Sequence, residues 1–262
     1  MRKICIYLIS LLCLASSLLA DESSPTRIKL HGEELIVTAS DGLELHAWLT
    51  VTSTKRVPLL ILLPMMGHTH RSYDPFMVAL FNRFTDSASA RSVQKIPNVL
   101  SLDLRGHGAS TIIAKDTINY RTMEPEDFRP YPSDVAAVIE RVLADHSAKI
   151  DRNKVMIVGA SIGANVSVMA AEMVSDIAKV VMLSPGENYR SLEPAPSIVN
   201  YTGKILIIAG SEDAYSKASS EKLAPLNANT TSLKIYSGPQ HGTDILDANE
   251  QAMADVLDWL LE

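Results

Sequence analysis

Cysteine is almost absent from this chain of 262 residues, which contains only Cys5 and Cys13. Both lie in a stretch in which Arg2 and Lys3 precede an almost continuous apolar run over residues 4–19. A basic start followed by a short apolar core is typical of a secretory signal peptide. Once this stretch is removed, the chain has no thiol, which excludes a disulfide framework and a cysteine nucleophile.

The chain also lacks an apolar run long enough to cross a membrane. The amino-terminal core is shorter than the roughly 20 residues that a spanning helix requires, and no later segment approaches that length. Because Ala20 precedes the acidic Asp21, we expect a signal peptide over residues 1–20, cleavage after Ala20 and a periplasmic or secreted protein without stable membrane insertion. An uncleaved anchor is the alternative.

Basic residues are outnumbered by acidic ones. Removing Arg2 and Lys3 from the 24 basic residues leaves 22 against 30 acidic residues, a net charge of about −8 with neutral histidines. Such a chain is a poor partner for nucleic acid. It also has no phosphate loop, dinucleotide fingerprint, repeat or Pro/Gly/Ser-rich linker. We therefore expect residues 21–262 to form one domain that holds no cofactor.

What the chain does contain is an alternation of apolar runs and helical patterns. Asp41 and Gly42 join residues 34–40 and 43–52 as a strand hairpin at an antiparallel edge. Unbroken runs rich in Val, Ile and Leu suit strands buried on both faces of a parallel sheet. These runs are residues 58–63, 99–102, 154–159, 179–183 and 204–209, with 233–237 suited to an edge. Helical patterns are residues 75–84, 133–145, 162–174, 216–223 and 248–261. The prediction is an α/β fold, a mostly parallel sheet with helices on both faces.

One run leads directly into Gly-Ala-Ser-Ile-Gly at 159–163, the pattern G-x-S-x-G, and then into a helical pattern. This junction holds a serine on a sharp, strained turn with its hydroxyl exposed. Gly159 and Gly163 allow the strand and the helix to pass close together. Ser161 is therefore the candidate nucleophile, and the N–H of Ile162 is the first candidate oxyanion donor.

Histidine becomes scarce after Ser161, since only His241 of the seven histidines follows it. A serine hydroxyl needs a base and a third group that orients the base. His241 follows the last predicted strand and is the candidate base. Asp213, in the loop after the preceding strand, is the candidate acid, with Glu212 as a near rival and Glu187 as a more distant one. The order serine, acid, histidine fits loops that meet over one sheet edge.

The turn after the run at 58–63 reads Pro-Met-Met-Gly-His-Thr-His. The N–H of Met66 is the expected second oxyanion donor, and that of Met65 is the alternative. His68 and His70, with Asp74 beyond them, suggest a metal site by their spacing, but nothing else in the sequence completes a ligand set. We expect no bound metal.

These motifs together resemble the α/β-hydrolase superfamily, close to secreted carboxylesterase-like and dienelactone-hydrolase-like members. The resemblance covers the chain from about Leu43 onward and rests on LLILLPMMGH, LSLDLRGHGAS, GASIGAN and the acid and histidine loops. It implies that Asp103, Arg105, Gly106 and Gly108 stabilise a turn without taking part in the chemistry.

The chain departs from these relatives in two places. Many of them have His-Gly where this chain has Pro64-Met65, which bears on the second oxyanion donor, and dienelactone hydrolases use a cysteine nucleophile. Only residues 184–203 occupy the place where a lid often enters, so we expect no large cap domain. Tyr189 and Tyr201, or the loop over residues 110–131, either form a wall of the cleft or pack within their loops.

The resemblance and the ordered residues predict a serine hydrolase that cleaves carboxylic esters or thioesters through an acyl-enzyme on Ser161, with a small-molecule ester as its partner. An amidase or peptidase on the same three residues is one alternative. A non-catalytic binding protein on a hydrolase scaffold is the other. The sequence leaves the physiological substrate, the acyl chain length and the oligomeric state open.

Overall fold

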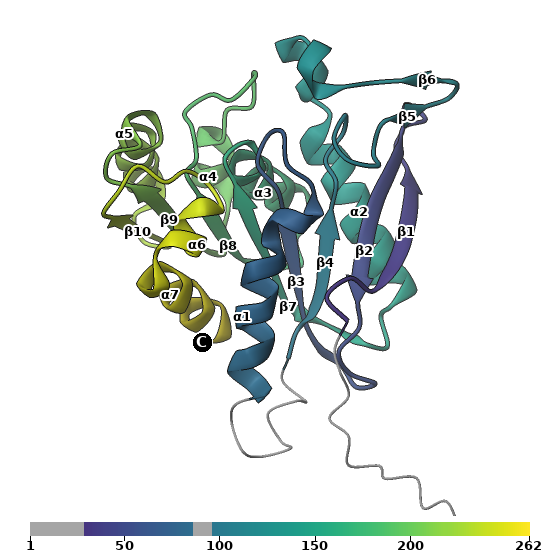
Figure 1. Ribbon diagram of the computed structural model, residues 1–262, viewed down its shortest axis with the longest axis horizontal. Helices are drawn as coiled ribbons and strands as arrows, with labels where there is room; N and C mark the ends of the chain where they lie inside the picture. Colours follow the sequence, from purple (N-terminus) through teal and green to yellow (C-terminus); the bar gives the residue numbers. More distant parts are fainter. Residues whose placement is uncertain (1–28, 86–95) are drawn as a thin grey trace, which may run out of the picture.

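A computed structural model describes residues 29–85 and 96–262 (Figure 1). The predicted signal peptide, residues 1–20, lies outside the described residues. Among the helices that are described, none is both long and apolar enough to cross a membrane.

The centre of the molecule is an eight-stranded sheet in the order β1-β2-β4-β3-β7-β8-β9-β10. Its strands are β1 (Glu33–Thr38), β2 (Glu44–Thr50), β3 (Val57–Leu63), β4 (Asn98–Leu102), β7 (Ile150–Ala160), β8 (Ile177–Leu183), β9 (Lys204–Gly210) and β10 (Thr231–Tyr236). The six strands from β4 to β10 in this order are parallel, and β1 and β2 form the predicted antiparallel edge.

Helices cover both faces of the sheet. They are α1 (Asp74–Thr85), α2 (Tyr131–Asp145), α3 (Ile162–Met173), α4 (Ala195–Asn200), α5 (Ala214–Leu223), α6 (Asp244–Ala248) and α7 (Glu250–Leu261). Figure 1 shows α1 and α7 in front of the sheet and α2 behind it. The predicted α/β architecture is confirmed, and the described residues include no large cap domain.

Strand β3 illustrates why the central runs are apolar without interruption. Leu59, Ile61 and Leu63 belong to the buried cluster under α2 and α3, whereas Leu60 and Leu62 belong to the cluster under α1, α6 and α7. Alternate residues of a strand point to opposite faces, so a strand covered on both sides has no polar face.

The structure extends some predicted elements and adds others. Strand β7 begins at Ile150, four residues before the predicted run, and the predicted last helix corresponds to α7, with α6 as an added short helix before it. Asn249 separates the two helices, and its side chain accepts a hydrogen bond from Ala252 N at 3.0 Å and caps α7. The short strands β5 (Ile112–Ile113) and β6 (Asp116–Thr117) and the helix α4 lie in segments predicted as loops.

Candidate active site

Ser161 lies at the junction between β7 and α3 with backbone angles φ 53° and ψ −116°. A non-glycine residue at positive φ is strained and must be held by its surroundings. A Cβ atom at Gly159 would collide with the Gly163 carbonyl, and one at Gly163 would lie 2.5 Å from the Pro64 carbonyl oxygen. The two glycines therefore allow the close passage that the sharp turn requires. The Ser161 residue is only 7% exposed.

Backbone N–H groups remain available beside this turn. Ser161 N donates to Leu183 O at 2.8 Å, whereas Ile162 is the first residue of α3, and its N–H has no partner inside the helix. Within the described chain, the N–H groups of Ile162, Met65 and Met66 donate no hydrogen bond. All three remain candidates for an oxyanion site, and the choice between Met66 and Met65 stays a prediction.

The structure brings Asp213 and His241 into direct contact. His241 Nδ1 lies 2.6 Å from Asp213 Oδ2. Asp213 is the N-cap of α5, and Gly242 N donates to the Ser184 hydroxyl at 2.9 Å, which fixes the histidine loop. A proton on Nδ1 that bonds to the carboxylate leaves Nε2 with a free lone pair, which is the state of a general base.

The rival carboxylates have other environments. Glu187 is paired with Lys222 Nζ at 2.7 Å, and Glu212 is exposed. Asp213 is thus the carboxylate that contacts His241.

Ser161 lies beside this pair without bonding to it. In the described part of the chain, no hydrogen bond joins the Ser161 hydroxyl to the His241 ring. The residues next to them do approach, because a Cβ atom at Gly242 would lie 3.4 Å from the Ala160 Cβ atom. The structure therefore joins two of the three predicted residues and places the third next to them.

The DLRGHG segment forms a hydrogen-bonded turn after β4. Asp103 accepts hydrogen bonds at 2.8 Å each from the His70 ring, His70 N and Ala109 N. Burial alone would raise the pKa of Asp103, but these hydrogen bonds outweigh it and lower the pKa. Arg105 binds Asp134 and Asp41 through its guanidinium. These contacts agree with the structural role that the resemblance implied for the turn.

The histidine pair after β3 is engaged in other contacts. His70 bonds to Asp103, and His68 Nδ1 lies 3.2 Å from Met66 O. Over residues 29–85 and 96–262, no group of three or more His, Cys, Asp or Glu side chains is arranged to hold a metal ion.

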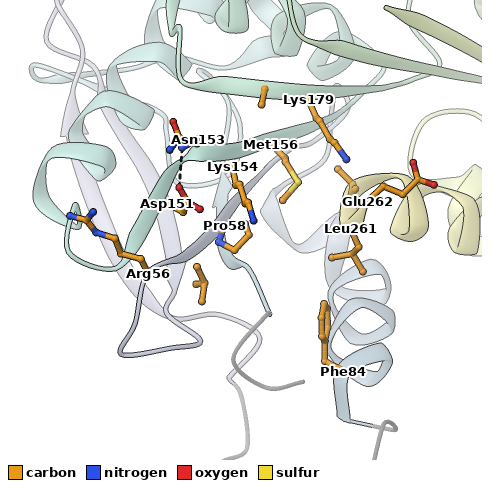
Figure 2. A pocket seen from close by; sticks show the side chains of 13 residues that line it. Arg56, Pro58, Phe84, Asp151, Asn153, Lys154, Met156, Lys179, Leu261 and Glu262 are labelled. Atoms are coloured by element: carbon orange, nitrogen blue, oxygen red, sulfur yellow. Dashed lines mark hydrogen bonds between the residues drawn. The ribbon is translucent and has the colours of Figure 1, made fainter. Parts of the chain in front are cut away.

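A surface cavity of about 560 Å³ lies at the edge of the sheet formed by the amino ends of the parallel strands (Figure 2). Its lining includes Arg56, Lys154 and Lys179, near the amino ends of β3, β7 and β8, and Glu262 at the end of the chain. The candidate nucleophile follows the carboxyl end of β7, so this cavity is separate from the candidate active site.

Ser216 contacts the candidate base without being among the predicted site residues, and the two loop tyrosines have different environments. Ser216 Oγ lies 3.4 Å from His241 Nδ1, and its only sequence signal is its position three residues after Asp213. Tyr189 reaches the site, whereas Tyr201 is buried and donates to Ile177 O at 2.9 Å. Tyr201 is therefore a loop-packing residue.

Comparison with known proteins agrees with this fold. Residues 60–258 match the Alpha/beta hydrolase family, and no curated protein matches the sequence. The esterase Pf2001 of Pyrococcus furiosus superposes with a TM-score of 0.65 at 14% identity, over 87% of this chain and 91% of that one. A putative aryl esterase from Burkholderia cenocepacia gives 0.64 at 17%, over 87% and 98%. Est1E from Butyrivibrio proteoclasticus, solved with ferulic acid, gives 0.61 at 17%, over 87% and 96%. Structural similarity at these identities shows only the fold. The family match spans most of the sequence, so the chain belongs to the alpha/beta hydrolase family.

Proposed function

We propose that this protein is a serine hydrolase that cleaves carboxylic esters or thioesters through an acyl-enzyme on Ser161. One observation carries the proposal: a strained serine at the β7–α3 junction adjoins an Asp213–His241 pair joined at 2.6 Å. Membership of the alpha/beta hydrolase family supports it, as do structural neighbours whose names describe them as esterases.

The proposed reaction begins when Ser161 Oγ attacks the carbonyl carbon of the substrate. His241 Nε2 takes the hydroxyl proton and then donates it to the leaving alkoxide or thiolate, while Asp213 holds the imidazole in the required tautomer. The N–H groups of Ile162 and Met66 stabilise the negative charge on the carbonyl oxygen. Water then attacks the acyl-enzyme, with His241 again acting as base, and releases the acid and free Ser161.

Attack requires the Ser161 hydroxyl to point toward His241. Serine has three staggered rotamers, so rotation about the Cα–Cβ bond of Ser161 redirects its hydroxyl. Hydrogen bonds between catalytic groups are often loose before substrate binds and tighten in the complex. The proposal therefore does not require a Ser161–His241 hydrogen bond among the described residues.

The test uses the purified chain with para-nitrophenyl esters of graded acyl length and a fluorophosphonate that labels activated serines. The wild type should hydrolyse at least the short esters and carry the label on Ser161. Ser161→Ala and His241→Ala should each lower kcat by roughly a thousandfold or more. His146→Ala, which changes a histidine outside the site, should retain activity. Ester turnover retained by Ser161→Ala would refute the proposal, and a clear preference for matched amides would replace the esterase with an amidase.

A further inference from the structure

The loop over residues 184–194 follows β8 and has an unusual backbone. Ser184, Arg190 and Ser191 all have positive φ, at 53°, 52° and 64°. Tyr189 and Leu192 pair across the loop as an antiparallel bridge. Non-glycine residues adopt such angles at an energetic cost, so other contacts must hold the loop in this shape.

Asn165 provides those contacts from the helix that carries the candidate nucleophile. It is completely buried in the first turn of α3, four residues after Ser161. Its Nδ2 donates to Gly186 O at 2.9 Å and to Leu192 O at 2.8 Å, and its Oδ1 accepts from Gly186 N at 3.1 Å. One amide side chain thereby ties both ends of the Tyr189 segment to α3.

The ring of Tyr189 lies between this loop and the candidate base. A Cβ atom at Gly186 would come within 2.7 Å of the Tyr189 ring and 2.8 Å of the Tyr215 ring, so glycine there makes room for both tyrosines. The centroids of the two tyrosine rings are 5.5 Å apart. The Tyr189 ring is nearly perpendicular to the His241 ring, with centroids 6.4 Å apart. This packing fixes where the Tyr189 hydroxyl points.

That hydroxyl contacts a residue that bonds to the acid and the base of the candidate active site. It lies 3.0 Å from Ser216 Oγ and donates to Ser184 O at 3.4 Å. Ser216 is fully buried; its N donates to Asp213 Oδ1 at 3.4 Å, and its Oγ lies 3.4 Å from His241 Nδ1. Burial raises the pKa of Tyr189, against the hydrogen bond of Ser216. The phenol therefore stays protonated and is able to donate a hydrogen bond.

We propose that Tyr189 is a positioning residue for the base. Its hydroxyl acts on the Asp213–His241 pair through Ser216. This inference rests on the proposed serine-hydrolase function. Ser216 contacts both Asp213 and His241, so its hydrogen bond with Tyr189 helps to hold the imidazole where it takes the Ser161 proton. Loss of the hydroxyl should therefore lower kcat and leave KM nearly unchanged.

Tyr189→Phe removes the hydroxyl and keeps the ring. We expect kcat for para-nitrophenyl acetate to fall roughly tenfold, the effect of one lost hydrogen bond at the reacting groups. KM should stay within about twofold, and labelling of Ser161 by the fluorophosphonate should slow by the same factor as kcat. The matched control is Tyr215→Phe, because the Tyr215 hydroxyl bonds to the backbone of Asn188. That control should leave kcat, KM and labelling unchanged.

A double-mutant cycle with Ser216→Ala separates positioning from loop packing. The Tyr189 and Ser216 hydroxyls act on His241 through the same chain of hydrogen bonds. The double variant should therefore be as active as the less active of the two single variants. Additive losses, a rise in KM with kcat unchanged, or a Tyr189→Phe variant with wild-type kcat would overturn the inference while the proposed function stands. A wild type that neither hydrolyses esters nor takes the label would overturn both. If Tyr189→Phe fails to fold, Ser216→Ala alone must slow labelling, and wild-type labelling there counts against the link.

Discussion

Ser161 combines its proposed chemical role with a backbone conformation that an L-residue adopts at an energetic cost. Its φ of 53° and ψ of −116° belong to a region that glycine enters easily and that an L-residue enters only when its surroundings require it. That constraint comes from Gly159 and Gly163, from helix α3 and from the hydrogen bond that Ser161 N donates to Leu183 O. The conformation of Ser161 therefore lowers the stability of the fold, and it places the hydroxyl at the sharp turn between β7 and α3.

This strain predicts an order of stability among variants of one residue. Ser161→Gly relieves the strain, whereas Ser161→Ala keeps it, so the glycine variant should be the more stable of the two by about 1 kcal/mol. Both should be inactive toward esters. Urea unfolding followed by circular dichroism measures the difference. An alanine variant as stable as the glycine variant would show that the backbone at this position is unstrained.

Arg105 and Asp134 form a buried ion pair, with side chains 6% and 7% exposed and Nε to Oδ2 at 2.7 Å. Burial raises the pKa of Asp134 even though Arg105 opposes the change. Arg105→Met removes the partner and leaves a carboxylate without compensation in the interior, so it should destabilise the fold by about 3–5 kcal/mol. The control is Arg152→Ala, which breaks an exposed pair with Asp176 and should leave the unfolding midpoint almost unchanged.

The lowered pKa of Asp103 predicts how the free energy of unfolding changes at acid pH. Its pKa is lowered in the folded protein, so its contribution is complete above the unfolded pKa, near 3.8, and is lost as the pH falls through the folded pKa. The free-energy gap between the wild type and Asp103→Asn should therefore be widest near neutral pH and narrow below about pH 4. Unfolding titrations at several pH values measure this gap. A gap that stays constant down to pH 3 would contradict the assignment.

At the scale of elements, the candidate site depends on how closely α3 approaches β3. A Cβ atom at Gly163 would lie 2.6 Å from Leu63 O and 2.5 Å from Pro64 O, so Gly163→Ala must push the helix away from the strand. The same shift separates the N–H groups of Ile162 and Met66. We expect a lower melting temperature together with loss of ester hydrolysis.

The control for this prediction is Gly42→Ala. Gly42 has positive φ, at 90°, which Gly163 does not, but no atom lies within 4 Å of its added Cβ position. This variant should cost only about 1 kcal/mol of conformational strain and retain activity. Equal activity in the two variants would show that close packing at Gly163 is not required for the site.

The sequence predicts the elements of the site better than their contacts. Unbroken apolar runs marked the parallel strands, and the order of Ser161, Asp213 and His241 put three loops at one sheet edge. The contacts of Tyr189 depend on positive φ at an arginine and a serine, for which no residue pattern exists, and on an amide four residues beyond the nucleophile. Such contacts arise from tertiary packing, which local propensity does not encode.

At the scale of the whole molecule, the sheet separates two buried clusters, and its central strands contribute alternate residues to each. One lies under α2 and α3, and the other lies under α1, α6 and α7, so residues near both ends of the described chain pack against the same strands. The first strand begins at Glu33. The predicted cleavage after Ala20 therefore precedes the first described strand.

We propose, from the basic start and the short apolar core of the sequence, that residues 1–20 are a signal peptide that serves export. When the full chain is expressed in a bacterium with a periplasm, the processed protein should be recovered from the periplasmic fraction. Measurement of its intact mass should show that it begins at Asp21. A variant lacking residues 2–20 should remain in the cytoplasm with the melting temperature and kcat of the processed protein. Ala20→Leu places a bulky side chain at the cleavage site and should yield an uncleaved product. Recovery of the wild-type chain from the cytoplasm with residues 1–20 attached would contradict the proposal, because a retained apolar run of this kind needs a membrane or a partner to cover it.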